Sequence, residues 1–287
     1  MEKILLQEMK KMNSLKALKI LLFFMILFSV VAIFLTTLKV SASEKIILCF
    51  YSSETNINNF KSLKMEFDNY LSKFGSYEFQ PFSDRDAFEK NIREKKGKQL
   101  LFLSSWHYNK IYKEYLLKPS LVGMRNGKDY QKRILVTTPK FANLNSVKAG
   151  PVASASNIEH TRNELGEMFK DKGSAESVRI LPVPKDVDAL MSVGFDMARA
   201  ALITENALND LKMLDPLLYE KMKILSEGKA SLLLILAVPE DSEKNAEDIV
   251  KIIKKMPDDP DGKNIIKMLD LDGWKPLNSS DTLNVEG

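Results

Sequence analysis

The chain has few of the residues that build disulfides or metal centres. Its 287 residues include one cysteine, Cys49, and two histidines, His107 and His160. One cysteine cannot form a disulfide within the chain, and no cysteine and histidine cluster has metal-ligand spacing. Cys49 lies in an apolar run, where a thiol is usually an inert core group. We therefore predict no metal site and no cofactor.

The chain also lacks the short motifs of common enzymes. It contains no G-x-S-x-G, no P-loop and no G-x-G-x-x-G, and no nucleophile–base pair stands out. The sequence predicts a protein that is not an enzyme. An extracytoplasmic enzyme is the disfavoured alternative, and turnover of a phosphate ester that is lost on Ser154→Ala would support it.

The excess of positive charge is confined to the N-terminus. The chain has 42 Lys and Arg against 38 Asp and Glu, and residues 1–42 hold six lysines and two acidic residues. Subtraction leaves 36 of each sign in residues 43–287. A neutral chain lacks the electrostatic footprint of a nucleic-acid-binding protein. We therefore predict no nucleic-acid partner.

The N-terminus carries the longest uncharged run. Nineteen residues, Ile20–Leu38, follow a basic patch and precede Val40-Ser41-Ala42. A basic region, an apolar region and small residues at the end are typical of a secretory signal peptide, here residues 1–42 with a true start at Met12. We predict a periplasmic or otherwise extracytoplasmic protein. The alternative is an uncleaved membrane anchor, because nineteen apolar residues just span a bilayer.

Residues 43–287 alternate short apolar runs with amphipathic stretches, which indicates α/β units. Strands are predicted at Lys45–Tyr51, Tyr77–Phe82, Gln99–Leu103, Val178–Val183, Ala200–Thr204 and Leu232–Val238. Helices are predicted at Phe60–Phe74, Asp84–Ile92, Asp186–Met191, Glu205–Leu214, Pro216–Glu227 and Ser242–Met256. Two successive cycles and a return strand indicate two lobes with a ligand cleft between them.

Local signals refine this division. Leu121–Arg125 and Arg133–Thr138 look like a strand pair around the Asn126-Gly127 turn. Ser156 and Glu159 fit a capping box at a helix start. We predict one lobe from 43–136 and 236–287 and the other from 137–235. Arg133–Thr138 and Leu232–Val238 are the candidate crossover strands.

Several segments resemble a known family. Pro182–Leu190, Ala200–Asn206 and Met256–Lys263, with Ile265–Leu269 and Gly273-Trp274 after them, are similar to phosphate/phosphonate-type substrate-binding proteins of ABC transporters. The resemblance implies the two-lobed type 2 periplasmic-binding-protein fold, in which each lobe is a mostly parallel sheet flanked by helices and two crossover strands join the lobes. It further implies a monomer that holds a small oxyanion and delivers it to a membrane permease.

The resemblance also implies an oxyanion loop at Ser154, Ser156 and Asn157. Free N–H groups and the dipole at a helix N-terminus favour an anion there. The family pattern is S-T-S-G, and this chain departs from it with Ala155 and Asn157. The loss of a hydroxyl and of glycine puts close approach of the anion in doubt. The alternative is plain helix capping by Ser156.

Polar turns after the predicted strands supply further ligand-binding candidates. Ser52, Ser53 and Thr55 follow the first strand, and Ser104, Ser105 and His107 follow the third. The carboxyl ends of parallel strands are where open α/β sheets bind ligands, although each residue alone is also an ordinary turn or cap former. Glu205 follows a later strand, where it either meets a ligand amine or simply begins a helix.

Two functions therefore remain open. The first is an exported solute-binding protein that captures phosphate or a phosphonate-like oxyanion for an ABC transporter. The second is a membrane-tethered or periplasmic sensory or accessory protein that uses the same fold to signal to a membrane partner.

Overall fold

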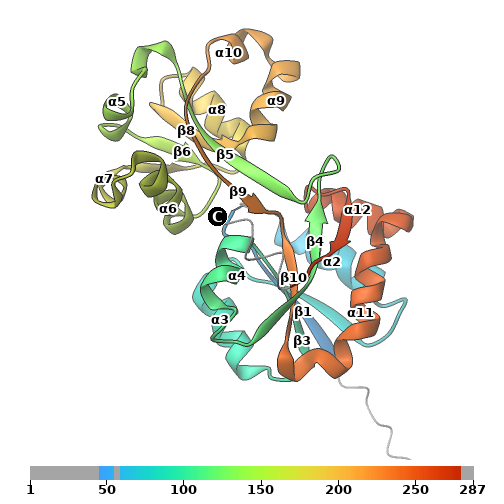
Figure 1. Cartoon of the computed structure of the whole chain (residues 1–287). Coiled ribbons are helices and arrows are strands. Elements are labelled where there is room, and N and C mark those ends of the chain that lie inside the picture. The colour runs from blue at the N-terminus through green and yellow to red at the C-terminus, as the bar shows by residue number, and fades with distance from the viewer. Residues whose placement is uncertain (1–44, 55–58, 279–287) are drawn as a thin grey trace, which may run out of the picture. The chain divides into compact units, whose positions relative to one another are not determined.

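The computed structural model describes residues 45–54 and 59–278. The predicted signal peptide and Thr55 lie outside the described residues. From Lys45 onward the chain forms one compact unit with two β-sheets (Figure 1). None of the helices in the described ranges is long and apolar enough to cross a membrane.

The first sheet has the strand order β11-β4-β10-β3-β1-β2. Its strands within the described residues are β1 (Ile46–Tyr51), β2 (Tyr77–Pro81), β3 (Gln99–Leu103), β4 (Leu117–Met124), β10 (Ile235–Pro239) and β11 (Gly273–Pro276). β1 pairs in parallel with β2 and β3, whereas β10 pairs antiparallel with β3 and β4, and β11 antiparallel with β4. Helices α2 (Phe60–Leu71), α3 (Arg85–Glu94), α4 (Ser105–Ile111), α11 (Glu243–Lys255) and α12 (Pro260–Met268) accompany this sheet, with short 3-10 turns at Glu240–Ser242 and Met256–Asp258.

The second sheet has the strand order β7-β6-β8-β5-β9. Its strands within the described residues are β5 (Tyr130–Thr137), β6 (Val152–Ser154), β7 (Ile180–Pro182), β8 (Ala200–Thr204) and β9 (Lys223–Leu232). β6 pairs in parallel with β7 and β8, and β5 pairs antiparallel with β8 and β9. Its helices are α5 (Leu144–Lys148), α6 (Ile158–Phe169), α7 (Lys172–Ser177), α8 (Asp186–Gly194), α9 (Glu205–Leu214) and α10 (Pro216–Glu220), with a 3-10 turn at Pro139–Phe141.

Both sheets form where the sequence supplies continuous apolar runs. All five residues of β3 and of β8 are buried, because helices cover both faces of a central strand. In the second sheet, Ile134 and Val136 face one apolar cluster and Leu135 faces the other. This alternation is the two-residue period of a strand. The predicted two-lobed α/β fold is therefore observed, with mixed sheets built around parallel cores.

The chain passes between the sheets twice. It leaves the first sheet after Met124 and returns to it after Leu232. The two passing segments are bonded together, since the Leu233 N–H donates to the Asp129 carbonyl over 2.9 Å and the Gly123 N–H to the Leu234 carbonyl over 2.8 Å. The sheet change thus falls at 125–129 and 233–234, while the predicted lobe boundaries were 136/137 and 235/236.

Three local predictions differ from the structure. The strands flanking Asn126-Gly127 do not pair with each other, because β4 belongs to the first sheet and β5 to the second. Helix α10 ends at Glu220, and the rest of the predicted helix is strand β9, which pairs along β5. The N-cap of α6 is Asn157 rather than Ser156, since the Asn157 side chain accepts from the His160 N–H.

Two helical glycines have opposite surroundings. A Cβ added to Gly262 in α12 would lie 2.3 Å from the Met256 carbonyl oxygen, whereas one added to Gly173 in α7 would meet only Asp171 Oδ1 at 3.5 Å. Glycine to alanine in an open helix position stabilises by about 0.5–1 kcal/mol. An overpacked site instead costs about 1–3 kcal/mol.

We expect Gly262→Ala to lower the free energy of unfolding by about 1–3 kcal/mol, because the backbone of Met256 must move. Gly173→Ala serves as the matched control and is expected to be neutral or stabilising. Urea denaturation of both variants measures the difference. Equal effects of the two substitutions would contradict the close packing of α12 on the turn before it.

Candidate functional site

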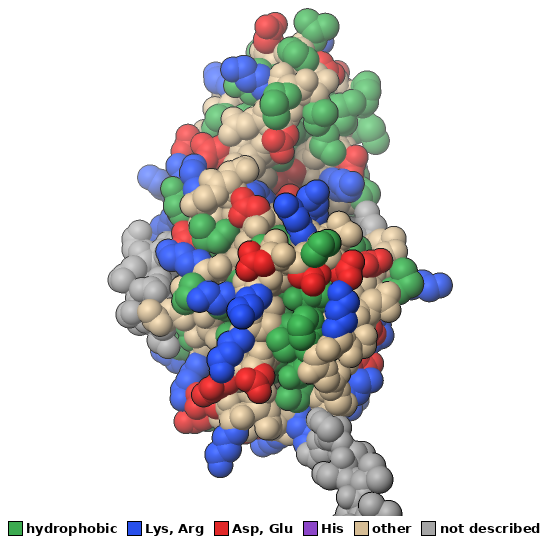
Figure 2. Space-filling model, turned by 90° about the vertical axis from the view of Figure 1, so that its right-hand side faces the viewer, with side chains coloured by type: hydrophobic (Ala, Val, Ile, Leu, Met, Phe, Trp, Pro, Cys, Tyr) green, Lys and Arg blue, Asp and Glu red, His purple; other side chains and the backbone are tan. Residues whose placement is uncertain are grey.

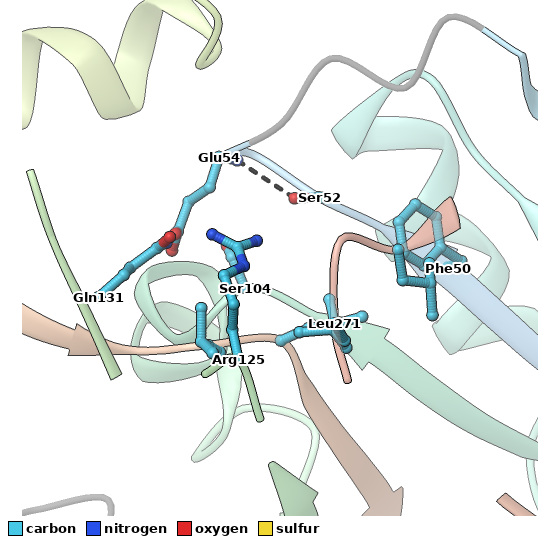
Figure 3. A pocket seen from close by; sticks show the side chains of 10 residues that line it. Phe50, Ser52, Glu54, Ser104, Arg125, Gln131 and Leu271 are labelled. Atoms are coloured by element: carbon cyan, nitrogen blue, oxygen red, sulfur yellow. Dashed lines mark hydrogen bonds between the residues drawn. The ribbon is translucent and has the colours of Figure 1, made fainter. Parts of the chain in front are cut away.

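A pocket of about 40 Å³ lies at the carboxyl ends of β1 and β3, beside the segments that join the sheets (Figure 3). That volume admits a few water molecules, which need about 10–15 Å³ each, or a small polyatomic ion. Its polar lining consists of Ser52, Glu54, Ser104, Arg125 and Gln131, and its apolar lining of Phe50, Leu233, Leu234, Leu269 and Leu271.

Glu54 dominates the polar side of this pocket. Its exposed fraction is 5%, and its Oε2 accepts a hydrogen bond from Gln131 Nε2. In Figure 3 the Glu54 and Gln131 side chains point toward each other. Burial raises the pKa of Glu54, and the nearby Arg133 opposes that rise.

The chain around Glu54 contacts the second sheet's loop directly. The Asn157 N–H donates to the Ser53 carbonyl over 2.9 Å, and Ser156 Oγ donates to the Glu54 carbonyl over 3.1 Å. Asn157 Nδ2 donates to the Tyr51 hydroxyl over 3.0 Å. Donors of the predicted oxyanion loop are therefore engaged by acceptors of this chain.

A group of charged and polar side chains is buried beside Glu54, and we call Glu54, Gln131, Arg133, His160 and Glu164 the interlobe cluster. Arg133 Nη2 donates to the Glu54 carbonyl over 2.8 Å and lies 4.0 Å from Glu54 Oε2. His160 Nε2 lies 3.6 Å from Glu164 Oε1. Within the described residues, Arg133 Nε and Nη1, Glu54 Oε1 and His160 Nδ1 have no hydrogen-bond partner.

Burial sets the protonation of this cluster. It lowers the pKa of His160 well below its usual value, and the positive charge of Arg133 acts in the same direction. His160 is therefore neutral at physiological pH. Burial raises the pKa of Glu164 to about 7, with Arg133 opposing the rise and the Glu54 charge adding to it.

Ion pairs outside the cluster also join the two sheets. Glu159 of α6 receives Arg85 Nη1 of α3 at 2.7 Å and Lys110 Nζ of α4. The hydrogen bonds from Lys110 and Arg85 outweigh burial and lower the pKa of Glu159. Glu159 therefore stays charged and holds α6 against two helices of the first sheet.

The predicted site residues fall into three groups. Ser52 and Ser104 line the pocket. Ser53, Ser156 and Asn157 lie at the contact between the sheets, and the Ser53 hydroxyl lies 2.6 Å from that of Ser104. The remaining predicted residues, Ser105, His107, Ser154 and Glu205, are not among the residues that line the pocket.

The members of this last group have other surroundings. Ser105 Oγ donates to the Leu232 carbonyl over 2.9 Å, and His107 Nε2 lies 2.9 Å from Glu89 Oε1. Ser154 Oγ accepts from the Ser156 N–H and from Thr161 Oγ1. Glu205 is exposed and begins α9.

Glu54, Arg125, Gln131 and Arg133 were not predicted as site residues. Glu54 directly follows the predicted serines, so its place after β1 was a usable signal. Gln131 and Arg133 are two residues apart on β5, a spacing that puts both side chains on one face of a strand. A buried Arg is rarely present without a partner.

The described residues offer neither a metal site nor a reactive thiol. Among the described residues, no group of His, Cys, Asp and Glu could hold a metal ion. Burial raises the pKa of the Cys49 thiol to about 12, which leaves it protonated and unreactive. On the face shown in Figure 2, Lys and Arg side chains are interspersed with Asp and Glu.

Comparison with known proteins identifies the fold. No protein-family model matches the sequence, and no curated protein matches it. Among solved structures, a binding-protein component of an ABC phosphonate transporter from Pseudomonas aeruginosa has a TM-score of 0.60 at 12% identity, over 84% of each chain. PhnD1 from Prochlorococcus marinus, in complex with methylphosphonate, has a TM-score of 0.58 at 12% identity, over 84% of this chain and 96% of that chain.

A Xanthomonas citri protein bound to ATP has a TM-score of 0.58 at 13% identity, over 85% of this chain and 95% of that chain. At such identities the likeness establishes the fold alone. The chain has the two-lobed fold of phosphonate-type substrate-binding proteins, the type 2 periplasmic-binding-protein fold. The predicted fold class is confirmed.

The raised pKa of Glu164 makes stability depend on pH. The native chain binds more protons than the unfolded chain between pH 4.5 and about 7, so stability falls as pH rises through that window. The loss amounts to about 3 kcal/mol. Glu164→Gln removes it, so we expect the variant to gain stability over the wild type at pH 8 and little at pH 5. Urea denaturation at both values tests this, with the exposed Glu167→Gln of the same helix as control for the lost charge. Parallel curves for wild type and Glu164→Gln would refute the assignment.

Proposed function

We propose that this chain is an exported solute-binding protein that captures a small oxyanion at the interlobe cluster and delivers it to an ABC transporter. The observation that carries the proposal is Arg133. Its side chain is 3% exposed, yet Nε and Nη1 have no hydrogen-bond partner among the described residues. Unpaired buried donors cost about 1–3 kcal/mol each, so their persistence favours a role in binding an acceptor.

The pocket that shares Glu54 and Gln131 with the interlobe cluster suits a phosphorus oxyanion. Arg125, Gln131, Ser104 and Ser52 supply charged and neutral donors at the pocket. Charge-assisted hydrogen bonds in a desolvated site are about twice as strong as neutral ones. Three structural relatives with TM-scores of 0.58–0.60 support the same chemistry, because one is a component of a phosphonate transporter, one is in complex with methylphosphonate and one is bound to ATP.

The two lobes also have the connections that ligand capture requires. Two bonded segments, 125–129 and 233–234, are the covalent links between the sheets. Closure about such links is a hinge motion. The proposal includes the lobe division at these segments and a monomeric state. It also includes contacts to the ligand from six residues, which are Ser52, Ser53, Thr55, Ser104, Ser156 and Asn157.

A thermal-shift series tests the ligand class. A chain beginning at Ser43 retains the compact unit Lys45–Gly287. We expect phosphate, methylphosphonate or phosphite to raise its melting temperature, since ligand at 100 times Kd adds about 2.7 kcal/mol, which is about 5–10 °C for a domain of this size. Arg133→Met should abolish the shift.

Lys132→Met, its neighbour on the same strand with a side chain paired to Glu227 at 2.9 Å, is the matched control and should retain the shift. If Arg133→Met does not fold, Arg133→Lys carries the test, because it keeps the charge and alters the donor geometry. The absence of a shift with every oxyanion would reject the ligand class and leave the fold unaffected.

The N-terminus separates the transporter role from the sensory role. We expect intact-mass analysis of the protein from its native compartment to give a chain that begins at Ser43, because Val40-Ser41-Ala42 has small residues where signal peptidase acts. A chain that retains Met1 or Met12 would instead indicate a tethered protein that signals to a membrane partner.

A further inference from the structure

Glu54 lies where donors converge. Its carboxylate accepts a hydrogen bond from Gln131 Nε2, and Arg133 Nη2 lies 4.0 Å from Oε2. Amide and guanidinium donors around one carboxylate are groups that a protein offers to a bound oxyanion. The acceptor that meets them is a side chain of the same protein.

The backbone of the same segment engages the donors of the other lobe. The Glu54 carbonyl accepts from Arg133 Nη2 and Ser156 Oγ, and the Ser53 carbonyl accepts from the Asn157 N–H. Residues 53 and 54 therefore contact donors on β5 and on the loop before α6. An oxyanion that used these donors would have to replace the acceptors of this segment.

The fit of Glu54 in this position is incomplete. Its Oε1 has no hydrogen-bond partner among the described residues, although the side chain is buried, and two nitrogen atoms of Arg133 are also unpartnered. Buried polar groups in native proteins are nearly always satisfied. A carboxylate retained for stability alone would be expected to pair with the adjacent guanidinium more closely than 4.0 Å.

We propose that Glu54 is an internal anion, which occupies the oxyanion position in the ligand-free protein and must be displaced for the ligand to bind. This inference rests on the proposed function, because it assumes that the interlobe cluster is the ligand site. Glu54 then lowers the apparent affinity, since only the fraction of molecules with a vacated position can bind. It also selects ligands, because an anion that binds beside the carboxylate without displacing it meets like-charge repulsion.

Chemical rescue tests the position without knowledge of the natural ligand. Glu54→Ala removes the carboxylate and leaves its donors in place. We expect formate or acetate, added to the chain that begins at Ser43, to raise the melting temperature of Glu54→Ala more than that of the wild type. Chloride at equal ionic strength should have no such selective effect. Glu247→Ala, which removes a carboxylate whose side chain is 83% exposed, is the matched control and should respond as the wild type does.

Phosphate affinity gives the second readout and separates the two proposals. By titration calorimetry we expect Glu54→Gln to bind phosphate about tenfold or more tightly than the wild type, within the usual range of coupling between sites. Selective rescue by formate without phosphate binding would support the internal anion and reject phosphate as ligand. Equal phosphate affinity of the wild type and Glu54→Gln would overturn the internal anion and keep the proposed function. If Glu54→Ala does not fold, the Glu54→Gln titration decides alone.

Discussion

The pairing of the two segments that join the sheets is the constraint on which the site depends. The Leu233 N–H bonds to Asp129 and the Gly123 N–H bonds to Leu234, so the two connections run as one bonded strip. Because β4 and β10 lead into this strip from the first sheet and β5 and β9 leave it for the second, the sheets meet beside it. The polar turn after β1 then faces the loop before α6, which is why the Ser156 hydroxyl bonds the carbonyl of Glu54, about a hundred residues earlier in the chain.

Burial of charge at this meeting point explains the electrostatics of the site. Arg133 and Glu54 are removed from water in a part of the molecule where the carboxylate and the guanidinium are only loosely paired. Such an arrangement costs free energy unless other groups satisfy it. Burial causes the lowered pKa of His160 and the raised pKa of Glu164. The positive charge of Arg133 adds to the fall for His160 and opposes the rise for Glu164.

The sequence predicted central elements well because their signal is local. Gln99–Leu103 and Ala200–Thr204 are predicted to the residue, since central strands covered on both faces read as unbroken apolar runs. β9 was missed because it pairs at the edge of its sheet and most of its residues are partly or fully exposed, so no apolar alternation marks it. The Asn126-Gly127 turn predicted a hairpin, but the chain changes sheets there.

Prediction of the site residues also depended on whether the signal is local in the sequence or comes from a long-range contact. Ser52 and Ser104 were predicted because strand ends are visible in sequence, and the structure places both in the pocket lining. Arg133 was missed because its role depends on Glu54, seventy-nine residues earlier in the chain. The shift of the α6 N-cap from Ser156 to Asn157 has the same origin. The Ser156 hydroxyl could cap α6 or bond the Glu54 carbonyl. In the structure it bonds the Glu54 carbonyl, and Asn157 caps the helix.

The position of Ser156 bears on how such a site can open. If Ser156 capped α6, its hydroxyl would bond within the helix start and would make no contact with the first lobe. With Asn157 as cap, the Ser156 hydroxyl, the Asn157 N–H and the Asn157 amide all bond acceptors in β1 or in the turn after it. Separation of the lobes breaks these bonds together while the Asn157 Oδ1 cap, which lies within the second lobe, is kept. Helix α6 can therefore remain folded when the lobes separate, and under the proposed function the donors at its start would become available to a ligand in one step.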